Sequence, residues 1–206
     1  MIRVACFDLG GVLVRITLDL VQAAERAGVG PVSAQGSFLE FGPFIDFQAG
    51  RIDQPTYLEA LGGHLRISAE DALRTHNHIL VGPYSGTHDL IVELAGQGIL
   101  CACLSNTNAP HWHEMRATDR FPNVRDLKLG VASHEHELEK PDPQFFRRFE
   151  VLASQEFESP LNPNKIVFFD DTRPNVEAAN ALGWRAFWID PAGDTADQMT
   201  RILVSL

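Results

Sequence analysis

Polar side chains end three apolar runs of this 206-residue chain, and their types suit phosphate and metal chemistry. The first run stops at Asp8, the second at Ser105-Asn106 and the third at Asp170-Asp171. In an open parallel sheet the ligand crevice lies at the carboxyl ends of the strands, so these residues converge if the runs are neighbouring strands. One such residue alone would be interpreted as a turn or a helix cap. Three strand ends that agree favour a common site.

The acidic residues among them suit a divalent cation. Three carboxylates close together cannot all stay ionised without a cation, because like charges raise each other's pKa. An all-oxygen set suits a hard ion such as Mg²⁺, which binds through a few carboxylates and phosphate oxygens. We therefore expect Asp8, Asp170 and Asp171 to lie at a Mg²⁺ site, where Ser105 and Asn106 can donate hydrogen bonds to phosphate.

A glycine pair and a lysine extend this pattern. Gly10 and Gly11 follow Asp8 closely and allow the backbone to turn sharply and approach a ligand, so we expect Gly11 to contact phosphate. Asp8 is then placed as a metal ligand or as a nucleophile, since some carboxylates form aspartyl-phosphates during phosphoryl transfer. Lys140 precedes a Pro-Asp-Pro segment and can supply positive charge, although an isolated lysine would be interpreted as solvated.

Five short apolar runs predict the strands that position these residues. The runs are 2–7, 99–104, 127–132, 165–169 and 185–189. Most are continuous rather than alternating, as in strands covered on both faces of a parallel sheet. Asp142 and Pro143 predict the start of one intervening helix. Pro174 opens another, which Gly183 ends, and Asp194 caps the last. The alternation predicts an α/β fold with a doubly wound, Rossmann-like parallel sheet.

Residues 15–85 have a different pattern, in which no strand is predicted. Helices are expected over 18–26, 38–48, 55–65 and 69–80, with glycine-rich breaks between them. A βαβ crossover needs far fewer residues, so the excess predicts an all-helical insertion over one edge of the sheet. We expect an α/β core formed by residues 1–14 and 86–206, with residues 15–85 as a helical cap.

Composition restricts the partners. Lys and Arg number 17 against 27 Asp and Glu, a net charge of −10, and no basic run offsets it, which argues against a nucleic-acid binder. No apolar run approaches the ~20 residues of a membrane span. The N-terminal residues are interpreted as a strand rather than a signal peptide. Cys6, Cys101 and Cys103 lie in apolar runs and predict buried free thiols. We expect a cytoplasmic monomer or small homo-oligomer, with no nucleic-acid or membrane partner.

The histidines give weaker signals. Residues 134–137, which precede Lys140, are interpreted as a solvated acidic loop, with a histidine lining the pocket as the alternative. Residues 111–113 follow the second motif and are interpreted as a partly exposed helix start, although they could flank a substrate. His76 and His78 are predicted to lie on the surface of the helical segment.

The polar residues fall into four motifs that together resemble the haloacid dehalogenase superfamily, in its phosphatase branch. The motifs are Phe7-Asp8-Leu9-Gly10-Gly11-Val12-Leu13, Leu104-Ser105-Asn106-Thr107-Asn108, Glu139-Lys140-Pro141-Asp142-Pro143 and Phe168-Phe169-Asp170-Asp171. They are most similar to small bacterial sugar-phosphate phosphatases of the glucose-1-phosphate type. The resemblance covers nearly the whole chain and implies Mg²⁺-dependent hydrolysis of a small phosphorylated metabolite, with a sugar phosphate favoured.

The resemblance also implies the metal ligands. Asp8 matches the family's nucleophile, which forms the aspartyl-phosphate and contacts Mg²⁺. Gly10 lies where a backbone carbonyl contacts the metal. Asp171 matches a direct ligand and Asp170 its water-mediated neighbour, although which of the two contacts the metal stays open.

The remaining matches imply roles around the phosphate. Ser105 and Asn106 match the phosphate-binding second motif. Lys140 matches the lysine that balances the charges of nucleophile and phosphate. Asn175 matches a supporting position beside the fourth motif.

One position departs from the family pattern. Most family phosphatases carry a second aspartate two residues after the nucleophile as general acid, whereas this chain has Gly10. General acid catalysis contributes ~10²–10⁴-fold, so poor leaving groups would react slowly unless the cap or water supplies the proton. Two alternatives stay open: a haloacid dehalogenase that uses Asp8 on carbon without metal, which leaves Asp170-Asp171 unexplained, and a catalytically weak phosphate-binding regulatory protein, supported only by Gly10.

Overall fold

The computed structural model describes residues 1–157 and 160–206 and centres on a five-stranded parallel sheet. The strands lie side by side in the order β5-β4-β1-β6-β7. In chain order their bounds are β1 Val4–Phe7, β4 Leu100–Ser105, β5 Leu129–Ala132, β6 Ile166–Asp170 and β7 Arg185–Trp188. Each predicted apolar run therefore overlaps one strand of this sheet, with β4 and β6 each ending one residue later than predicted.

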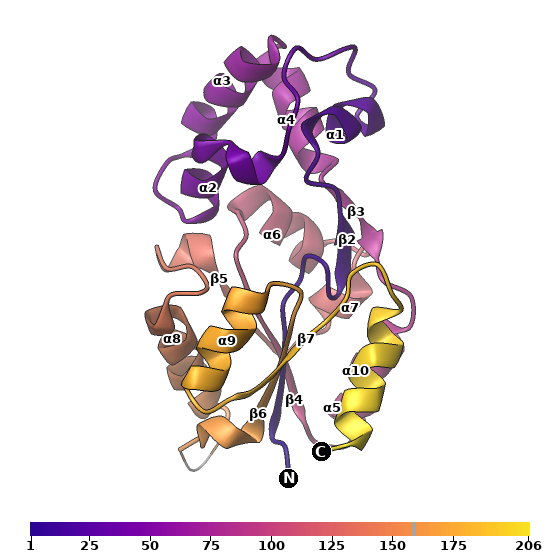
Figure 1. Cartoon of the computed structure of the whole chain (residues 1–206), viewed down its shortest axis with the longest axis vertical. Coiled ribbons are helices and arrows are strands. Elements are labelled where there is room, and N and C mark those ends of the chain that lie inside the picture. Colours follow the sequence, from indigo (N-terminus) through magenta and orange to yellow (C-terminus); the bar gives the residue numbers. More distant parts are fainter. Residues whose placement is uncertain (158–159) are drawn as a thin grey trace.

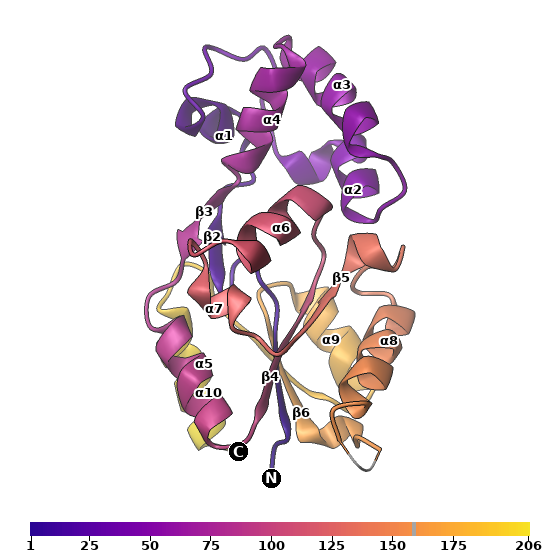
Figure 2. The same ribbon diagram turned by 180° about the vertical axis from the view of Figure 1, so that it is seen from behind.

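Helices cover both faces of the sheet, which confirms the doubly wound α/β fold (Figures 1 and 2). The core helices are α5 Thr87–Gly96, α6 Ala109–Ala117, α7 Pro122–Arg125, α8 Pro143–Ser154, α9 Arg173–Ala181 and α10 Thr195–Val204, with 3₁₀ turns η2 Ser133–Glu135 and η3 Pro163–Lys165. Successive strand residues point to opposite faces. Cys6 accordingly packs in the apolar cluster that contains α8 and α9, whereas Phe7 packs in the one that contains α5 and α10.

The predicted helix signals are confirmed. The Asp142 side chain accepts a hydrogen bond from the backbone N–H of Gln144 at the start of α8. Asp194 caps α10 through the N–H of Asp197. Pro174 lies in the first turn of α9, and Gly183 follows that helix in the left-handed region, with φ +87°.

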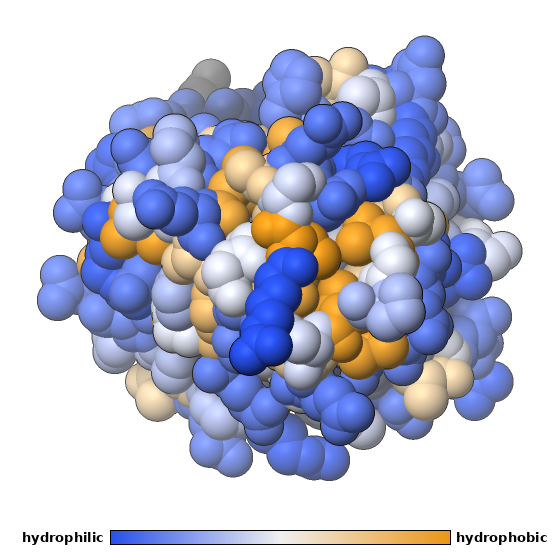
Figure 3. All heavy atoms as spheres, turned by 90° about the horizontal axis from the view of Figure 1, so that it is seen from above, coloured by the Kyte–Doolittle hydropathy of each residue, from blue (hydrophilic) through white to orange (hydrophobic). Residues whose placement is uncertain are grey.

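A helical lobe lies above the carboxyl edge of the sheet (Figure 1). Its elements are α1 Leu20–Arg26, η1 Phe38–Glu40, α2 Gly42–Gln48, α3 Gln54–Leu65 and α4 Ala69–Asn77. They pack around their own apolar cluster, which includes Phe44, Tyr57 and Leu61. Seen from above, the lobe is mostly hydrophilic, with apolar side chains showing between the polar ones (Figure 3).

Two short strands join the lobe to the core, and the expectation of no strand within 15–85 is wrong. β2 (Val14–Ile16) and β3 (Leu80–Pro83) form an antiparallel ribbon, and the helix predicted over 69–80 ends at Asn77. The partners Arg15 and Gly82 are far apart in sequence. Each strand is short and is stabilised by a partner that is distant in sequence. Neither strand therefore shows a hydrophobic period that a search over short stretches of sequence can detect.

Over the described ranges 1–157 and 160–206, no helix has both the length and the apolar character needed to cross a bilayer. The cysteines Cys6, Cys101 and Cys103 are buried and unbridged, as predicted.

Candidate active site

Three adjacent strands bring the predicted residues to one edge of the sheet. β1 lies between β4 and β6, and Phe7 pairs with Cys103 on one side and Phe169 on the other. Asp8 directly follows β1, while Ser105 and Asp170 are the last residues of β4 and β6. The strands therefore end at the same level, and their polar residues converge as the sequence pattern predicts.

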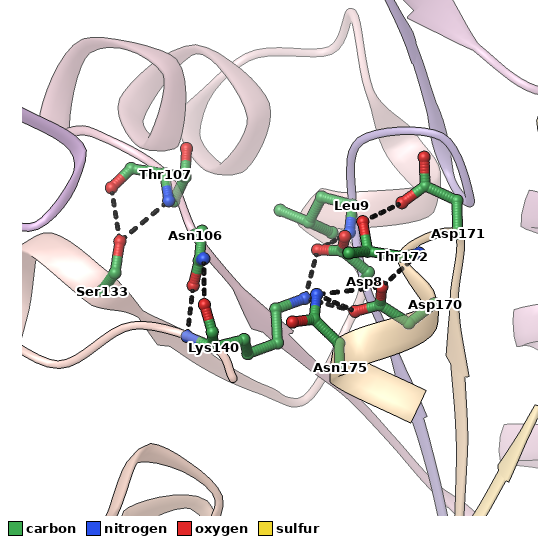
Figure 4. Close-up of polar contacts among 10 residues, drawn as sticks. All are labelled: Asp8, Leu9, Asn106, Thr107, Ser133, Lys140, Asp170, Asp171, Thr172 and Asn175. Carbon is green, nitrogen blue, oxygen red and sulfur yellow. Dashed lines mark hydrogen bonds and ion pairs between the residues drawn. The ribbon is translucent and has the colours of Figure 1, made fainter. Parts of the chain in front are cut away.

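Lys140 is the charged centre of this edge. Its side chain is 1% exposed, and Nζ lies 2.9 Å from Asp8 Oδ1 and 2.7 Å from Asp170 Oδ2 (Figure 4). Burial alone would lower the pKa of the Lys140 ammonium, but the charges of Asp170 and Asp8 outweigh burial and raise it. The interpretation as a solvated lysine is therefore wrong, because both carboxylates hold this ammonium in the interior.

Asp170 is buried and fully engaged by protein donors. Besides Lys140, its carboxylate accepts hydrogen bonds from the Asn175 amide at 3.0 and 3.1 Å and from the Thr172 backbone N–H at 2.8 Å. These donors fix the orientation of the carboxylate. Asp170 therefore positions Lys140, and Asn175 in turn positions Asp170.

Asp171 has a more open environment than its neighbour. Its carboxylate points away from Lys140 in Figure 4, and its hydrogen bond to a side chain comes from the Thr172 hydroxyl at 3.3 Å. Gly11 lies against it with φ +76°, where a Cβ would come within 2.1 Å of Asp171 Oδ2. The glycine is required for this close approach. Asp171 is therefore less engaged by protein donors than Asp170.

The acidic cluster fits a divalent metal ion. Asp8, Asp170 and Asp171 each offer an oxygen, and these oxygens lie within 4.8 Å of one another. Burial raises the pKa of the Asp8 carboxyl to about 7, with Asp170 and Asp171 adding to the rise and Lys140 opposing it. Burial, followed by the charge of Asp170, also raises the pKa of Asp171. One lysine does not compensate for three carboxylates, and a hard cation such as Mg²⁺ supplies the missing charge.

The side chain of Asn106 binds protein rather than facing the site. Its Nδ2 donates to the Lys140 carbonyl at 2.9 Å, and its Oδ1 accepts from the Lys140 N–H at 2.8 Å. Asn106 therefore holds the backbone that carries the buried lysine. This side-chain role differs from the expected hydrogen bond to phosphate. Ser105 is buried, and in the described part of the chain its hydroxyl has no recorded partner, so it remains a candidate phosphate donor.

An apolar side chain abuts the position where most family phosphatases carry the general acid. A Cβ on Gly10 would lie 2.8 Å from Ile16 Cδ1, in β2. Gly10 also forms a β-bridge with Val14, which holds this turn beside the ribbon. The space that the side chain of a general acid would need beside Gly10 is therefore occupied by Ile16.

Near the site lies a buried polar network that the sequence pattern did not predict. His76 is fully buried, so its predicted surface position is wrong, and it stacks on buried His111 with ring centroids 4.1 Å apart. Tyr57, from the helical lobe, and Asn108, from the second motif, complete the network. Ala72 lies four residues before His76 and Ile79 lies three residues after it, and both are apolar. This spacing was the signal for a buried helix face.

The partners of this network assign its protons. His111 Nε2 donates to the His76 carbonyl at 2.9 Å, so Nδ1 accepts from Asn108 Nδ2 at 3.2 Å. Asn108 Oδ1 then accepts from His76 Nε2 at 3.1 Å, and His76 Nδ1 accepts from the Tyr57 hydroxyl at 2.9 Å. Burial lowers the pKa of His111 to about 4 and that of His76 well below its usual range. Both rings are neutral.

Comparison by sequence connects the chain to a known phosphatase. A scan against protein-family profiles finds no match. Among curated proteins, the chain is 27% identical over 190 residues to the sesquiterpene phosphatase astK of Aspergillus oryzae. The match covers 88% of this chain and 86% of that protein.

Comparison by structure establishes the fold. The HAD family enzyme BT-2542 of Bacteroides thetaiotaomicron, in complex with magnesium and inorganic phosphate, superposes with a TM-score of 0.76 at 20% identity, covering 96% of this chain and 99% of the other. A predicted HAD-like family hydrolase from Porphyromonas gingivalis gives 0.77 at 24% identity, covering 98% of each chain. The chain thus has a Rossmann-like α/β fold with a lysine–carboxylate site whose acidic residues could hold a metal ion. The chain therefore shares the fold of these HAD family structures.

Proposed function

We propose that this protein is a Mg²⁺-dependent phosphatase that hydrolyses a small phosphate monoester through an aspartyl-phosphate on Asp8. The carrying observation is the buried ammonium of Lys140 between Asp8 and Asp170, with Asp171 completing a cation site. The similarity to a fungal phosphatase, and to an enzyme whose structure holds magnesium and phosphate, supports the proposal.

The chain's own residues perform the proposed steps. A carboxylate oxygen of Asp8 attacks phosphorus, the bond from phosphorus to the alcohol oxygen breaks, and the departing alkoxide takes a proton from water. A second water then attacks phosphorus and releases inorganic phosphate and the free carboxylate. Lys140 holds Asp8 in place and balances negative charge. Asp8, Asp171 and the Gly10 carbonyl would hold Mg²⁺, which when bound reduces the repulsion between the carboxylate and the phosphate.

We also propose that residues 15–85 act as a cap over a core made of residues 1–14 and 86–206. The Ser133 hydroxyl donates to the carbonyl of Gln48, at the end of α2, at 2.5 Å. Gly50, with φ +75°, packs against His134, where a Cβ would lie 2.7 Å from the carbonyl oxygen. These contacts support a closed arrangement that keeps bulk water from the site.

The other hypotheses account for less of the site. A dehalogenase acting on carbon gives no reason for a cluster of three carboxylates. A binding protein without turnover gives no reason for a nucleophile held by a buried lysine. A sugar phosphate as substrate, a cytoplasmic location and a monomeric or small homo-oligomeric state stay predictions.

The test is hydrolysis of p-nitrophenyl phosphate with and without Mg²⁺ by the wild type and by Asp8→Asn. We expect Mg²⁺-dependent turnover in the wild type and a loss of at least about 10³-fold in the variant, because the nucleophile is removed. Asp119→Asn is the matched control, since that side chain is 97% exposed, and it should retain wild-type activity. Equal rates for Asp8→Asn and the wild type would remove Asp8 from the mechanism.

A further inference from the structure

A small cavity lies between the phosphate-binding motifs and the helical lobe. Its volume is about 50 Å³. Gly10, Ser105 and Asn106 line its side toward the sheet, and Phe44 and Ile79 line its side toward the lobe. A phosphoester held at the ends of β1 and β4 has its alcohol within reach of this space. One water occupies about 30 Å³ of liquid, so a cavity of this size holds only the first few atoms of an alcohol.

The chemistry of the lining is apolar and uncharged. Among the described residues around the cavity none carries a formal charge, and most are aliphatic or aromatic. Of the five polar side chains among these residues, two are already engaged, since the Asn106 amide binds Lys140 and His111 binds Asn108 and the His76 carbonyl. The other three belong to Gln48, Ser105 and Thr107. Three such side chains are fewer than the hydroxyls of a sugar, and hydroxyls buried without partners weaken binding.

The space next to Gly10, close to Asp8, is also apolar. Ile16 lines the cavity and fills the space next to Gly10, with its Cδ1 2.8 Å from where a Cβ would lie. A methyl group thus stands where the oxygen of a general acid would otherwise approach the leaving group. Hydrocarbon in the substrate would contact hydrocarbon in the protein at this point.

We propose that this cavity selects phosphate monoesters of short, uncharged hydrocarbon alcohols, alkyl or alkenyl, over sugar phosphates. The proposal rests on the phosphatase function above and names its substrate class. Binding follows from burial of apolar surface, and discrimination follows from the desolvation of sugar hydroxyls that the lining leaves unpaired.

The experiment compares kcat/KM for isopentyl phosphate, glucose 6-phosphate and glucose 1-phosphate, with Mg²⁺ and the full chain. Isopentyl phosphate and glucose 6-phosphate are both esters of primary alcohols, so their ratio reports the fit of the alcohol more than its leaving ability. We expect isopentyl phosphate to exceed both sugar phosphates by at least about 10-fold, since single-group differences in apolar pockets give roughly 10–200-fold.

Hydrolysis of p-nitrophenyl phosphate in parallel separates the two proposals. Turnover of this ester together with a sugar phosphate equal to or better than isopentyl phosphate would overturn the selectivity and leave the phosphatase function standing. No hydrolysis of p-nitrophenyl phosphate would overturn the function, and the selectivity with it.

A pair of variants tests the cavity itself. Leu18, a half-buried residue of the lining, is changed to Gln to bring an amide into the cavity. Leu58→Gln is the matched control, on a half-buried leucine of α3 that lines a different part of the lobe. We expect Leu18→Gln to lower the ratio of isopentyl phosphate to glucose 6-phosphate by about 10-fold and Leu58→Gln to leave it unchanged. A mere loss of stability would not move this ratio, and an unmoved ratio in Leu18→Gln contradicts the assignment.

Discussion

The role that each residue has at this site depends on how deeply its side chain is buried. Asp170 and Lys140 are almost completely enclosed and satisfy each other, which makes them the fixed part of the site. Removing one partner of such a pair is costly, because the other charge stays buried and unpaired. Asp8 and Asp171 are the less enclosed members of the acidic cluster, and in the proposed mechanism they contact the ligands. Two adjacent aspartates therefore serve different purposes.

Gly10 gives a prediction at the scale of one residue. Gly10→Asp combined with Ile16→Ala introduces a proton donor and clears the methyl that a Cβ would meet. We expect kcat for isopentyl phosphate to rise by about 10-fold or more, because general acid catalysis helps a poor leaving group. Hydrolysis of p-nitrophenyl phosphate should change little, since its leaving group needs no proton.

The measurement is kcat for both esters in the double variant and in Ile16→Ala alone, which controls for the enlarged cavity. An equal change for both esters in the double variant would show that the new carboxyl does not act as an acid.

At the scale of elements, α4 and α6 meet through the stacked pair His76 and His111. This contact joins the helical lobe to the second motif through Asn108, which also caps α6. Every assigned donor in it has an acceptor while both rings are neutral. A proton added at His111 Nδ1 would face the Asn108 amide N–H, so acid breaks the pattern.

This network predicts how stability depends on pH. The pKa of His111 is depressed to about 4 by burial, against about 6.5 in the unfolded chain, so the unfolded state binds the proton more readily. The contribution of His111 is therefore fully present above pH ~6.5 and is lost as the pH falls towards ~4. Its size is at most about 3 kcal/mol.

The test compares urea unfolding free energies of the wild type and His111→Ala between pH 7 and 4. We expect the difference between the two proteins to shrink by up to about 3 kcal/mol as the pH falls, because the variant lacks the titrating ring. His113→Ala, on the exposed face of the same helix, should follow the wild type. A constant difference across this range would show that the pKa of His111 is not lowered in the folded protein.

At the scale of the whole molecule, the cation site joins the ends of β1 and β6, which are far apart in sequence. Unfolding separates the carboxylates, so an ion that binds them together stabilises the folded state alone. At a concentration 100-fold above its Kd, Mg²⁺ should stabilise the protein by about 2.7 kcal/mol.

Thermal melts with and without Mg²⁺ check this prediction. We expect Mg²⁺ to raise Tm in the wild type and in Asp119→Asn, whose substitution is remote and exposed. In Asp171→Asn the rise should largely disappear, because a direct ligand is lost. A full rise in Asp171→Asn would place the ion elsewhere.

The order of residues was enough to predict the sheet and its covering helices, and it indicated which acidic residues lie together at one edge of the sheet. Continuous apolar runs and capping residues are local signals, and parallel strands carry their terminal polar residues to one edge. Asp8 and Asp171 could be found in this way because each directly follows the last residue of a strand, and Lys140 because it shortly precedes α8.

Only the tertiary structure decided the rest, because those features depend on contacts between distant segments. The β2–β3 ribbon pairs residues on opposite sides of the helical lobe. His76 is buried by residues from other helices, although its own helix presents a polar sequence. Asp170 and Asp171 differ in their hydrogen bonds because Lys140 and Asn175 both donate to Asp170. Residue spacing along a chain does not encode these distances, which arise when the elements pack.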